Sequence, residues 1–195
     1  MKIIGLTGNA GSGKSTALDF FRSKNIDGIS TDAINADLRQ HSQYLAIVIE
    51  NTLQEKISDD NGLIDAKRLR DVIFISESSR AAIEMILHPV IMENVDLQLS
   101  LLPQNNYCII EIPLLFEAGL LSCVDSVLLV ASNRTELAER LNSRRQMTPG
   151  EIDAILHSQL ADNKKILPSN DIVLNNDTQE AFQERLDKLY HRNSQ

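Results

Sequence analysis

A glycine-rich stretch near the N-terminus carries the residue types that bind phosphate. Residues 8–16 read Gly-Asn-Ala-Gly-Ser-Gly-Lys-Ser-Thr and fit the pattern G-x-x-x-x-G-K-[ST]. Glycines allow a tight backbone curl that turns N–H groups inward, and a helix N-terminus behind the curl adds the positive end of a dipole. Lys14 can then reach the β/γ-phosphates of a nucleotide, and the Ser15 hydroxyl can ligate Mg²⁺. The alternative is a strand-to-helix turn that binds no ligand. The match to the motif, with a strand predicted before it and a helix after it, disfavours this alternative. The residues of this phosphate loop expected to contact the nucleotide are Asn9, Ala10, Gly11, Ser12, Gly13, Lys14, Ser15 and Thr16.

Two carboxylates are expected at the edge of the sheet where this loop lies. Residues 26–30 read as a short strand that Asp32 follows closely, and residues 107–112 are the clearest buried strand, with Glu111 near its end. In open α/β sheets ligands lie beyond the carboxyl ends of the strands, so we predict Asp32 close to the bound phosphate. Glu111 matches the position of an acid that holds Mg²⁺ directly or through water. A helix N-cap is the alternative for Asp32, and a solvent-facing carboxylate is the alternative for Glu111.

A pair of arginines forms a third candidate group. Arg140 and Arg144 stand four residues apart in a predicted helix, so they share one face. In an acidic chain this local cluster indicates a lid that closes on a triphosphate. A solvated helix face, with the arginines paired to Glu136 and Glu139, is the alternative.

The elements that must position these residues alternate along the chain. Strands are predicted at residues 2–6, 26–30, 107–112, 126–130 and 171–174. Between the second and third strands, apolar residues recur with helical spacing, which predicts a helical insert. This order implies an α/β fold, a doubly wound parallel sheet of five strands. We predict a single domain with three parts: a core at residues 1–32, 103–132 and 166–195, the insert at about 33–102, and a lid at about 133–165.

Composition narrows the class of protein. The chain has 195 residues, 43% of them hydrophobic, and a net charge of -8. An acidic balance argues against a nucleic-acid partner, because phosphate backbones require clustered Lys and Arg. No apolar run reaches membrane-spanning length, and the first strand leaves no room for a signal peptide. Cys108 and Cys123 give no disulfide framework, so a reduced cytoplasm is the expected compartment.

Several segments outside the phosphate loop resemble the dephospho-CoA kinase family, and the resemblance runs along nearly the whole chain. The discriminating segments are His-Pro at residues 88–89 and Pro-Leu-Leu-Phe-Glu at residues 113–117. Arg140, Arg144 and Gln159 fall where the family's lid residues fall. Further similar segments are Gly5–Thr16, Asp32 as an acid of an Asp-x-Asp motif, Leu69–Phe74, Arg80–Glu84 and Asp171–Asn176.

The resemblance implies transfer of the γ-phosphoryl group of ATP to the ribose 3′-hydroxyl of dephospho-CoA, with Mg²⁺. It makes ATP the nucleotide of the phosphate loop and adds Asn175 to the ATP-binding residues. The residues it implies for catalysis are Lys14, Asp32 and Arg140, with Asp32 as the base that accepts the hydroxyl proton. The acceptor would be held by Asp32, Arg80, His88, Pro89, Leu115 and Glu117. The expected partners are these small molecules, and the expected assembly is a monomer or small homo-oligomer.

Three positions depart from the family pattern. Ser30 stands where the first acid of the Asp-x-Asp motif is expected, Glu111 where an Asp is usual, and Ile155 where a lid arginine is expected. Arg140 and Arg144 would then carry more of the lid's role. A nucleoside or nucleotide kinase with the same core is the alternative function. A nucleotide-dependent switch is a further one, although the guanine-reading Asn-Lys-x-Asp pattern of GTPases does not occur.

Overall fold

The computed structural model describes residues 1–103, 107–145, 147–159, 162–166 and 168–193. The described strands and helices alternate as the sequence predicts. In chain order they are β1 (Lys2–Thr7), α1 (Lys14–Ser23), β2 (Asp27–Ser30), α2 (Thr31–His41), α3 (Gln43–Leu53), α4 (Ala66–Ile75), α5 (Glu77–Leu101), β3 (Tyr107–Glu111), a 3₁₀ turn (Leu120–Cys123), β4 (Ser126–Ala131), α6 (Arg134–Arg145), α7 (Pro149–Ser158), α8 (Asp162–Ile166), β5 (Asp171–Leu174) and α9 (Gln179–Asn193).

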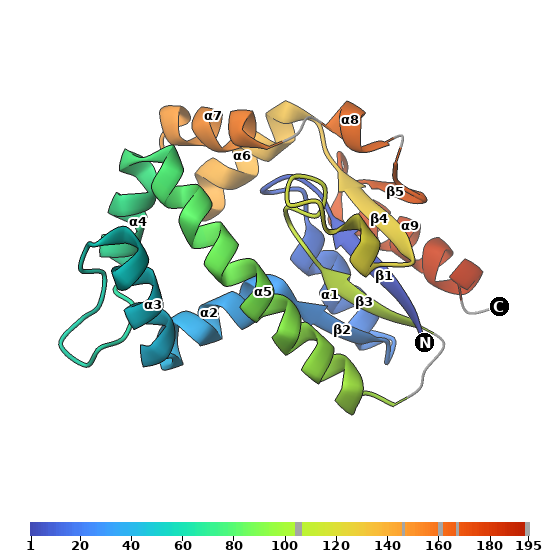
Figure 1. The fold of residues 1–195 in the computed structure, drawn as a ribbon. Coiled ribbons are helices and arrows are strands. Elements are labelled where there is room, and N and C mark those ends of the chain that lie inside the picture. The colour runs from blue at the N-terminus through green and yellow to red at the C-terminus, as the bar shows by residue number, and fades with distance from the viewer. Residues whose placement is uncertain (104–106, 146, 160–161, 167, 194–195) are drawn as a thin grey trace. The chain divides into compact units, whose positions relative to one another are not determined.

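The strands form one five-stranded sheet in the order β2-β3-β1-β4-β5, and every neighbouring pair is parallel (Figure 1). The predicted fold class is therefore confirmed. β1 is central and pairs with both β3 and β4, so the loop that follows β1 leaves the middle of the sheet. Every residue of β3 is buried, which agrees with its nearly continuous apolar sequence.

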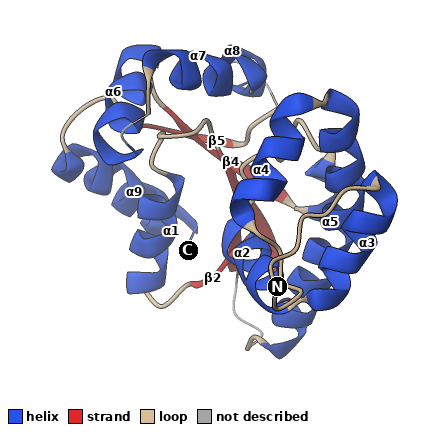
Figure 2. Cartoon of the chain, turned by 90° about the vertical axis from the view of Figure 1, so that its left-hand side faces the viewer, coloured by secondary structure: helices blue, strands red, loops and turns tan. Residues whose placement is uncertain are grey.

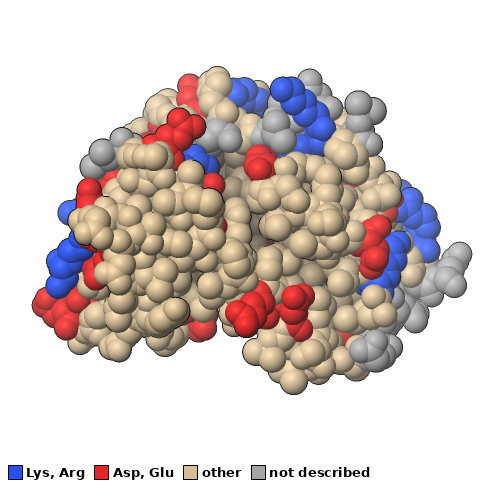
Figure 3. Space-filling view, viewed as in Figure 1, with Lys and Arg blue, Asp and Glu red and all other residues tan. Residues whose placement is uncertain are grey.

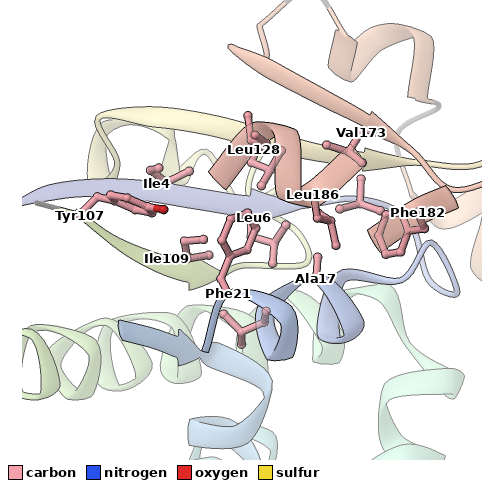
Figure 4. Packing of buried hydrophobic residues seen from close by; sticks show 13 residues of the cluster. Ile4, Leu6, Ala17, Phe21, Tyr107, Ile109, Leu128, Val173, Phe182 and Leu186 are labelled. Carbon is pink, nitrogen blue, oxygen red and sulfur yellow. The ribbon is translucent and has the colours of Figure 1, made fainter. Parts of the chain in front are cut away.

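A hydrophobic core lies between this sheet and two helices. α1 contributes Ala17, Leu18 and Phe21, and α9 contributes Phe182 and Leu186, all of them almost completely buried. Alternate residues of the strands point toward these helices, as period-two alternation requires (Figure 4). α1 and α9 also contact each other beside the strands (Figure 2). The core thus fixes the start of α1 against the end of β1, where the phosphate loop connects them.

The chain divides into two compact units, Met1–Ser30 with Leu102–Gln195, and Thr31–Leu101. The first unit contains the sheet, α1 and α6 to α9. The second contains α2 to α5, and within it α5 packs against each of the other three helices. The assignment of an acceptor-binding role to this helical segment stays a prediction.

The long helix α5 contains a proline. Proline removes one backbone donor and crowds the preceding turn, so many helices end or kink beside one. This helix continues from Glu77 to Leu101 with Pro89 inside it. Buried residues continue at a spacing of four on both sides of the proline, at Ile83, Leu87, Ile91 and Val95. Burial of this apolar stripe outweighs the loss of one hydrogen bond.

The surface carries charges of both signs. On the face drawn in Figure 3, acidic and basic side chains form small groups, and some groups of opposite sign adjoin each other. Among the described residues, none of the helices combines the length and the apolar composition needed to cross a membrane.

Candidate active site

Two glycines allow the phosphate loop to curl between β1 and α1. Gly8 has φ +152°, and a Cβ atom there would lie 2.2 Å from the carbonyl oxygen of Val130. Gly13 has φ +105°, and a Cβ atom there would lie 2.5 Å from Nδ2 of Asn175. Any other residue at either position would clash and would also adopt a left-handed backbone conformation. The predicted loop therefore depends on close approach to β4 and to the end of β5.

Lys14 is the first residue of α1, and its side chain turns back over the loop. The residue is 8% exposed, and Nζ donates hydrogen bonds to the carbonyl oxygens of Gly8 at 2.9 Å and Asn9 at 3.1 Å. Its positive charge is therefore held against the loop backbone. Ser12 is completely buried, and its hydroxyl has no hydrogen-bond partner among the described residues. Buried hydroxyls are normally paired, so the interior of this loop has hydrogen-bonding capacity beyond its own contacts.

Glu111 joins the phosphate loop to the end of β2. The residue is only 3% exposed. Oε1 accepts a hydrogen bond from Oγ of Ser15 at 3.1 Å, and Oε2 accepts one from Oγ of Ser30 at 2.9 Å. Glu111 also stands opposite Leu6 and Ser30 in the parallel register. A solvent-facing carboxylate, the alternative for Glu111, is therefore wrong.

The hydroxyl of Ser15 and the carboxylate of Glu111 form a donor set that suits Mg²⁺. Both are oxygen ligands, which this hard cation prefers, and Mg²⁺ commonly takes only one or two protein ligands beside phosphate and water. Among the described residues no group of three or more His, Cys, Asp or Glu side chains could hold a metal ion by itself. The residues present thus fit a metal that binds together with a nucleotide.

Arg140 connects the lid helix α6 to the phosphate loop. Its guanidinium donates to the carbonyl oxygen of Asn175 at 2.8 Å, to Oγ of Ser132 at 3.3 Å and, more weakly, to the carbonyl oxygen of Gly11 at 3.5 Å. It also pairs with Glu136 at 3.2 Å, as the solvated-face alternative proposed. The Arg140 side chain is only 18% exposed, however, so most of this side chain is removed from solvent. The side chain of Arg144 lies outside the described residues.

Asn175, the residue after β5, supports the loop from the other side. Its backbone N–H donates to Ala131, and its side-chain Nδ2 donates to the carbonyl oxygen of Ser12 at 2.7 Å. The structure therefore brings together residues that are far apart in sequence. Asn175 contacts the phosphate loop, and its predicted binding of ATP stays a prediction.

Helices α6 and α7, in the predicted lid segment, also pack against the loop. Their buried residues form a small apolar cluster of Leu137, Leu141, Ile152 and Leu156, and Ala10 of the loop packs against it. A capping box between Thr148 and Glu151 starts α7.

The predicted acceptor residues fall in both units. Asp32, Arg80, His88 and Pro89 belong to the Thr31–Leu101 unit, and Leu115 and Glu117 to the other. α2 begins at Thr31, so Asp32 lies in its first turn, where a carboxylate interacts favourably with the helix dipole. Asp32 stands two positions after Ser30, whose hydroxyl contacts Glu111.

The structure shows the burial or the ion pairs of three predicted acceptor residues. Arg80 Nε lies 2.9 Å from Oε1 of Glu84 in an exposed pair. Leu115 is completely buried, and Glu117 is paired with Lys165. Contact of these residues with an acceptor stays a prediction.

Two lid residues contact the first turn of the loop. Gln159, which the resemblance placed in the lid, accepts a hydrogen bond from the backbone N–H of Ala10 at 2.8 Å. Lys165 was missed as a functional candidate, and its Nζ lies 2.8 Å from Oδ1 of Asn9. The sequence alone does not separate Lys165 from its neighbour Lys164, since both follow the same polar run and only the helix orientation buries one of them.

The family model and the curated relatives that match this chain name one family. The family model described as Dephospho-CoA kinase matches residues 2–181. The dephospho-CoA kinase of Legionella pneumophila (strain Paris) is 32% identical over 189 residues, which cover 97% of this chain and 94% of that protein. The crystal structure of TT1252 from Thermus thermophilus is 28% identical, with a TM-score of 0.86, and the match covers 98% of this chain and 96% of that one. The dephospho-CoA kinase from Campylobacter jejuni, 23% identical, shares the fold with a TM-score of 0.72 over 98% of this chain and 97% of that one.

Proposed function

Because the chain belongs to the dephospho-CoA kinase family, we propose that Lys14, Asp32 and Arg140 carry out that family's reaction. The reaction transfers the γ-phosphoryl group of ATP to the ribose 3′-hydroxyl of dephospho-CoA and yields coenzyme A. The chain is thus an ATP-dependent phosphotransferase, and neither a general nucleotide kinase nor a switch protein is favoured.

The phosphate loop and Lys14 bind the phosphates of ATP in this proposal. The transition state of phosphoryl transfer is loose, so catalysis consists mainly of positioning and of stabilising negative charge. The buried Lys14 ammonium, held next to the loop backbone, and the unpaired buried hydroxyl of Ser12 support this assignment.

Ser15 and Glu111 would hold Mg²⁺. When bound, the ion offsets charge on the β- and γ-phosphates. The contact of 3.1 Å between the two side chains supports a shared site. Glu111 also keeps the Ser15 hydroxyl oriented before any nucleotide arrives.

Asp32 would orient the acceptor hydroxyl and take its proton. The position of Asp32 in the chain supports this role. Asp32 lies in the first turn of α2, directly after β2, and the last residue of β2, Ser30, hydrogen-bonds Glu111. The remaining acceptor residues would hold the nucleotide and pantetheine portions of dephospho-CoA.

Arg140 and Arg144 would meet the ATP phosphates from the lid, and the lid would exclude water that otherwise hydrolyses ATP. Arg140 already hydrogen-bonds the loop residue Gly11. We further propose that the protein works in the cytoplasm on these small molecules, as a monomer or a small homo-oligomer, with no nucleic-acid or membrane partner.

The observation that carries the proposal is the bridge that Glu111 makes between Ser15 of the phosphate loop and Ser30 at the end of β2. It joins the nucleotide end of the site to the strand that leads into Asp32. The same buried carboxylate therefore contacts both the phosphate loop and the strand that precedes Asp32 in the chain.

Replacement of Lys14 tests the site. We expect Lys14→Ala to fold normally and to lose about 100-fold or more in phosphoryl transfer, because its charge acts mainly in the transition state. The assay follows coenzyme A formed from ATP and dephospho-CoA. Lys24→Ala is the matched control, since Lys24 caps the other end of α1 and pairs with Asp187. Near-normal turnover of Lys14→Ala would overturn the assignment of the loop.

A further inference from the structure

Lys165, in the short helix α8, has a completely buried side chain. Lysine is almost never fully buried unless it is paired, because removing an ammonium group from water is costly. The adjacent Lys164 is exposed. Something in the surroundings of Lys165 must therefore compensate its charge.

Two loops supply that compensation. Nζ of Lys165 donates a hydrogen bond to Oδ1 of Asn9 at 2.8 Å and lies 2.9 Å from Oε1 of Glu117. Asn9 follows β1, and Glu117 belongs to the 113–117 loop that follows β3. These two strands are neighbours in the sheet. One ammonium group thus joins the phosphate loop to the loop beside it.

Asn9 in turn fixes the opening turn of the phosphate loop. Its carbonyl oxygen accepts hydrogen bonds from Nζ of Lys14 at 3.1 Å and from the backbone N–H of Ser12 at 3.1 Å. The orientation of the Asn9 peptide therefore affects where the Lys14 ammonium rests. A shift of the Asn9 side chain would move this carbonyl and the charge that it holds.

We propose that Lys165 is a positioning residue for phosphoryl transfer. Its ammonium fixes Asn9, and through Asn9 the carbonyl oxygen that holds Lys14, while Glu117 anchors it to the 113–117 loop. Lys165 acts through these residues and does not touch the substrates. The inference rests on the proposed function, since it gives Lys14 its role in catalysis.

A purely structural role for the Lys165–Glu117 pair is the competing explanation. Desolvation offsets much of the attraction within a buried ion pair, so such a pair adds little net stability compared with apolar residues. Its contribution here is geometric, because it sets the position of a side chain that belongs to the phosphate loop.

The test begins with Lys165→Met, which keeps the length and apolar stem of the side chain and removes the charge. We expect kcat to fall roughly 10- to 100-fold, because misplacing a catalytic group by about 1 Å has an effect of that size. The KM for dephospho-CoA should change much less. Lys164→Met is the matched control on the same helix and should match the wild type in both quantities.

A double-mutant cycle with Asn9→Ala asks whether Lys165 acts through Asn9. If it does, the double variant will be no slower than the slower of the two single variants, because both changes break one linkage. Losses that multiply in the double variant would overturn the proposal, as would a normal kcat in Lys165→Met.

A second pair of variants serves as the control for a folding defect. Lys165→Met leaves the Glu117 carboxylate buried without its cation, which can lower the midpoint of urea unfolding. Lys165→Met combined with Glu117→Gln removes that charge, and we expect the midpoint to recover while kcat stays roughly 10- to 100-fold below that of the wild type. Recovery of both the midpoint and wild-type kcat would show a structural role and overturn the proposal.

Lys14→Ala, assayed in parallel, separates this inference from the proposed function. If Lys14→Ala is inactive and Lys165→Met is normal, only the positioning role fails. If Lys14→Ala keeps near-normal turnover, the assignment of the whole site fails.

Discussion

Ser30 and Glu111, two residues that depart from the family pattern, hydrogen-bond each other. Ser30 stands where an acid is expected, and it donates to Oε2 of Glu111 at 2.9 Å. A glutamate side chain is one methylene longer than aspartate, and here it reaches Ser15 with its other oxygen. The two departures thus fit together at the residue scale. Asp32 remains the acid of that segment that we propose for the acceptor hydroxyl.

Asp32→Asn tests that assignment. The change keeps the side-chain shape and removes the base and its charge, so we expect transfer to fall about 100-fold or more while the binding of ATP and dephospho-CoA changes little. Steady-state rates measure the expected loss of transfer, and equilibrium binding of ATP and dephospho-CoA measures whether affinity is kept. Asp37→Asn is the control on the same helix, because Asp37 is exposed and pairs with His41. Activity that survives in Asp32→Asn would indicate that Asp32 only favours the helix terminus.

At the scale of elements, the segment predicted to form a lid contacts the phosphate loop. α6 contributes Arg140, the end of α7 leads to Gln159, and α8 contributes Lys165, and each of these contacts a residue of the phosphate loop. α6 and α7 are held together by their own apolar cluster, so they form one small packed layer. A change in the lid is therefore expected to alter the geometry of the loop directly.

Arg140→Ala should slow turnover more than it weakens the binding of dephospho-CoA. The arginine joins Gly11 of the loop to Asn175, which contacts the loop, and the proposal places its charge near the phosphates. Comparison of kcat with the KM of each substrate measures the effect. Arg134→Ala is the control, because Arg134 lies on the same helix in an exposed pair with Asp153, which contributes little. Arg144→Ala is expected to resemble Arg140→Ala. If both lose only thermal stability, the arginines serve a solvated face.

Glu50 of α3 makes the stability of the helical unit dependent on pH. Hydrogen bonds from the side chain of Ser58, from its backbone and from the backbone of Ile57 lower the pKa of Glu50. A carboxyl whose pKa is lower in the folded state contributes stability above its unfolded pKa and loses it as pH falls through the folded pKa. This contribution should therefore be complete at neutral pH and decline below about pH 4.3, the ordinary value for glutamate.

Glu50→Gln isolates this effect, since it keeps an oxygen for the hydrogen bonds and cannot titrate. We expect the variant to be less stable than the wild type near pH 7, and the difference to shrink toward about pH 3. Urea unfolding at both pH values measures the free energy of unfolding. Glu55→Gln, on an exposed residue close by, is the control. Parallel pH dependence in Glu50→Gln and the wild type would contradict the assignment.

At the scale of the whole molecule, the chain consists of a nucleotide-binding sheet unit and a compact helical unit, which the backbone connects twice, after Ser30 and after Leu101. The proposed donor residues lie in the first unit. Most of the proposed acceptor residues lie in the second. Discrimination among acceptors is therefore expected to depend on the helical unit.

A comparison of acceptors tests the role of the helical unit. Contacts with the pantetheine portion can be used to position the reacting hydroxyl, so kcat/KM for dephospho-CoA should exceed that for adenosine or AMP by about 100-fold or more. An acceptor that lacks the pantetheine portion should therefore show a lower kcat as well as a higher KM. Equal turnover of AMP would leave the helical unit without its proposed role.

The sequence alone determined the features that depend on local pattern. Residues 8–16 specify a phosphate loop, because a curl of inward N–H groups needs glycine at particular positions. Continuous apolar runs such as residues 107–112 predicted buried parallel strands, and the alternation of elements predicted the sheet, which the structure confirms. Each of these signals lies within a few neighbouring residues.

Only the tertiary structure decided which distant side chains meet. Glu111 bridges Ser15 and Ser30 because three parallel strands place their ends together, and no local pattern contains that register. α5 passes through Pro89 because apolar packing along its length outweighs a missing hydrogen bond. Lys165 is buried and Lys164 exposed because α8 turns one of them toward Asn9 and Glu117. Sequence spacing cannot express these contacts, since each depends on how separate elements pack against one another.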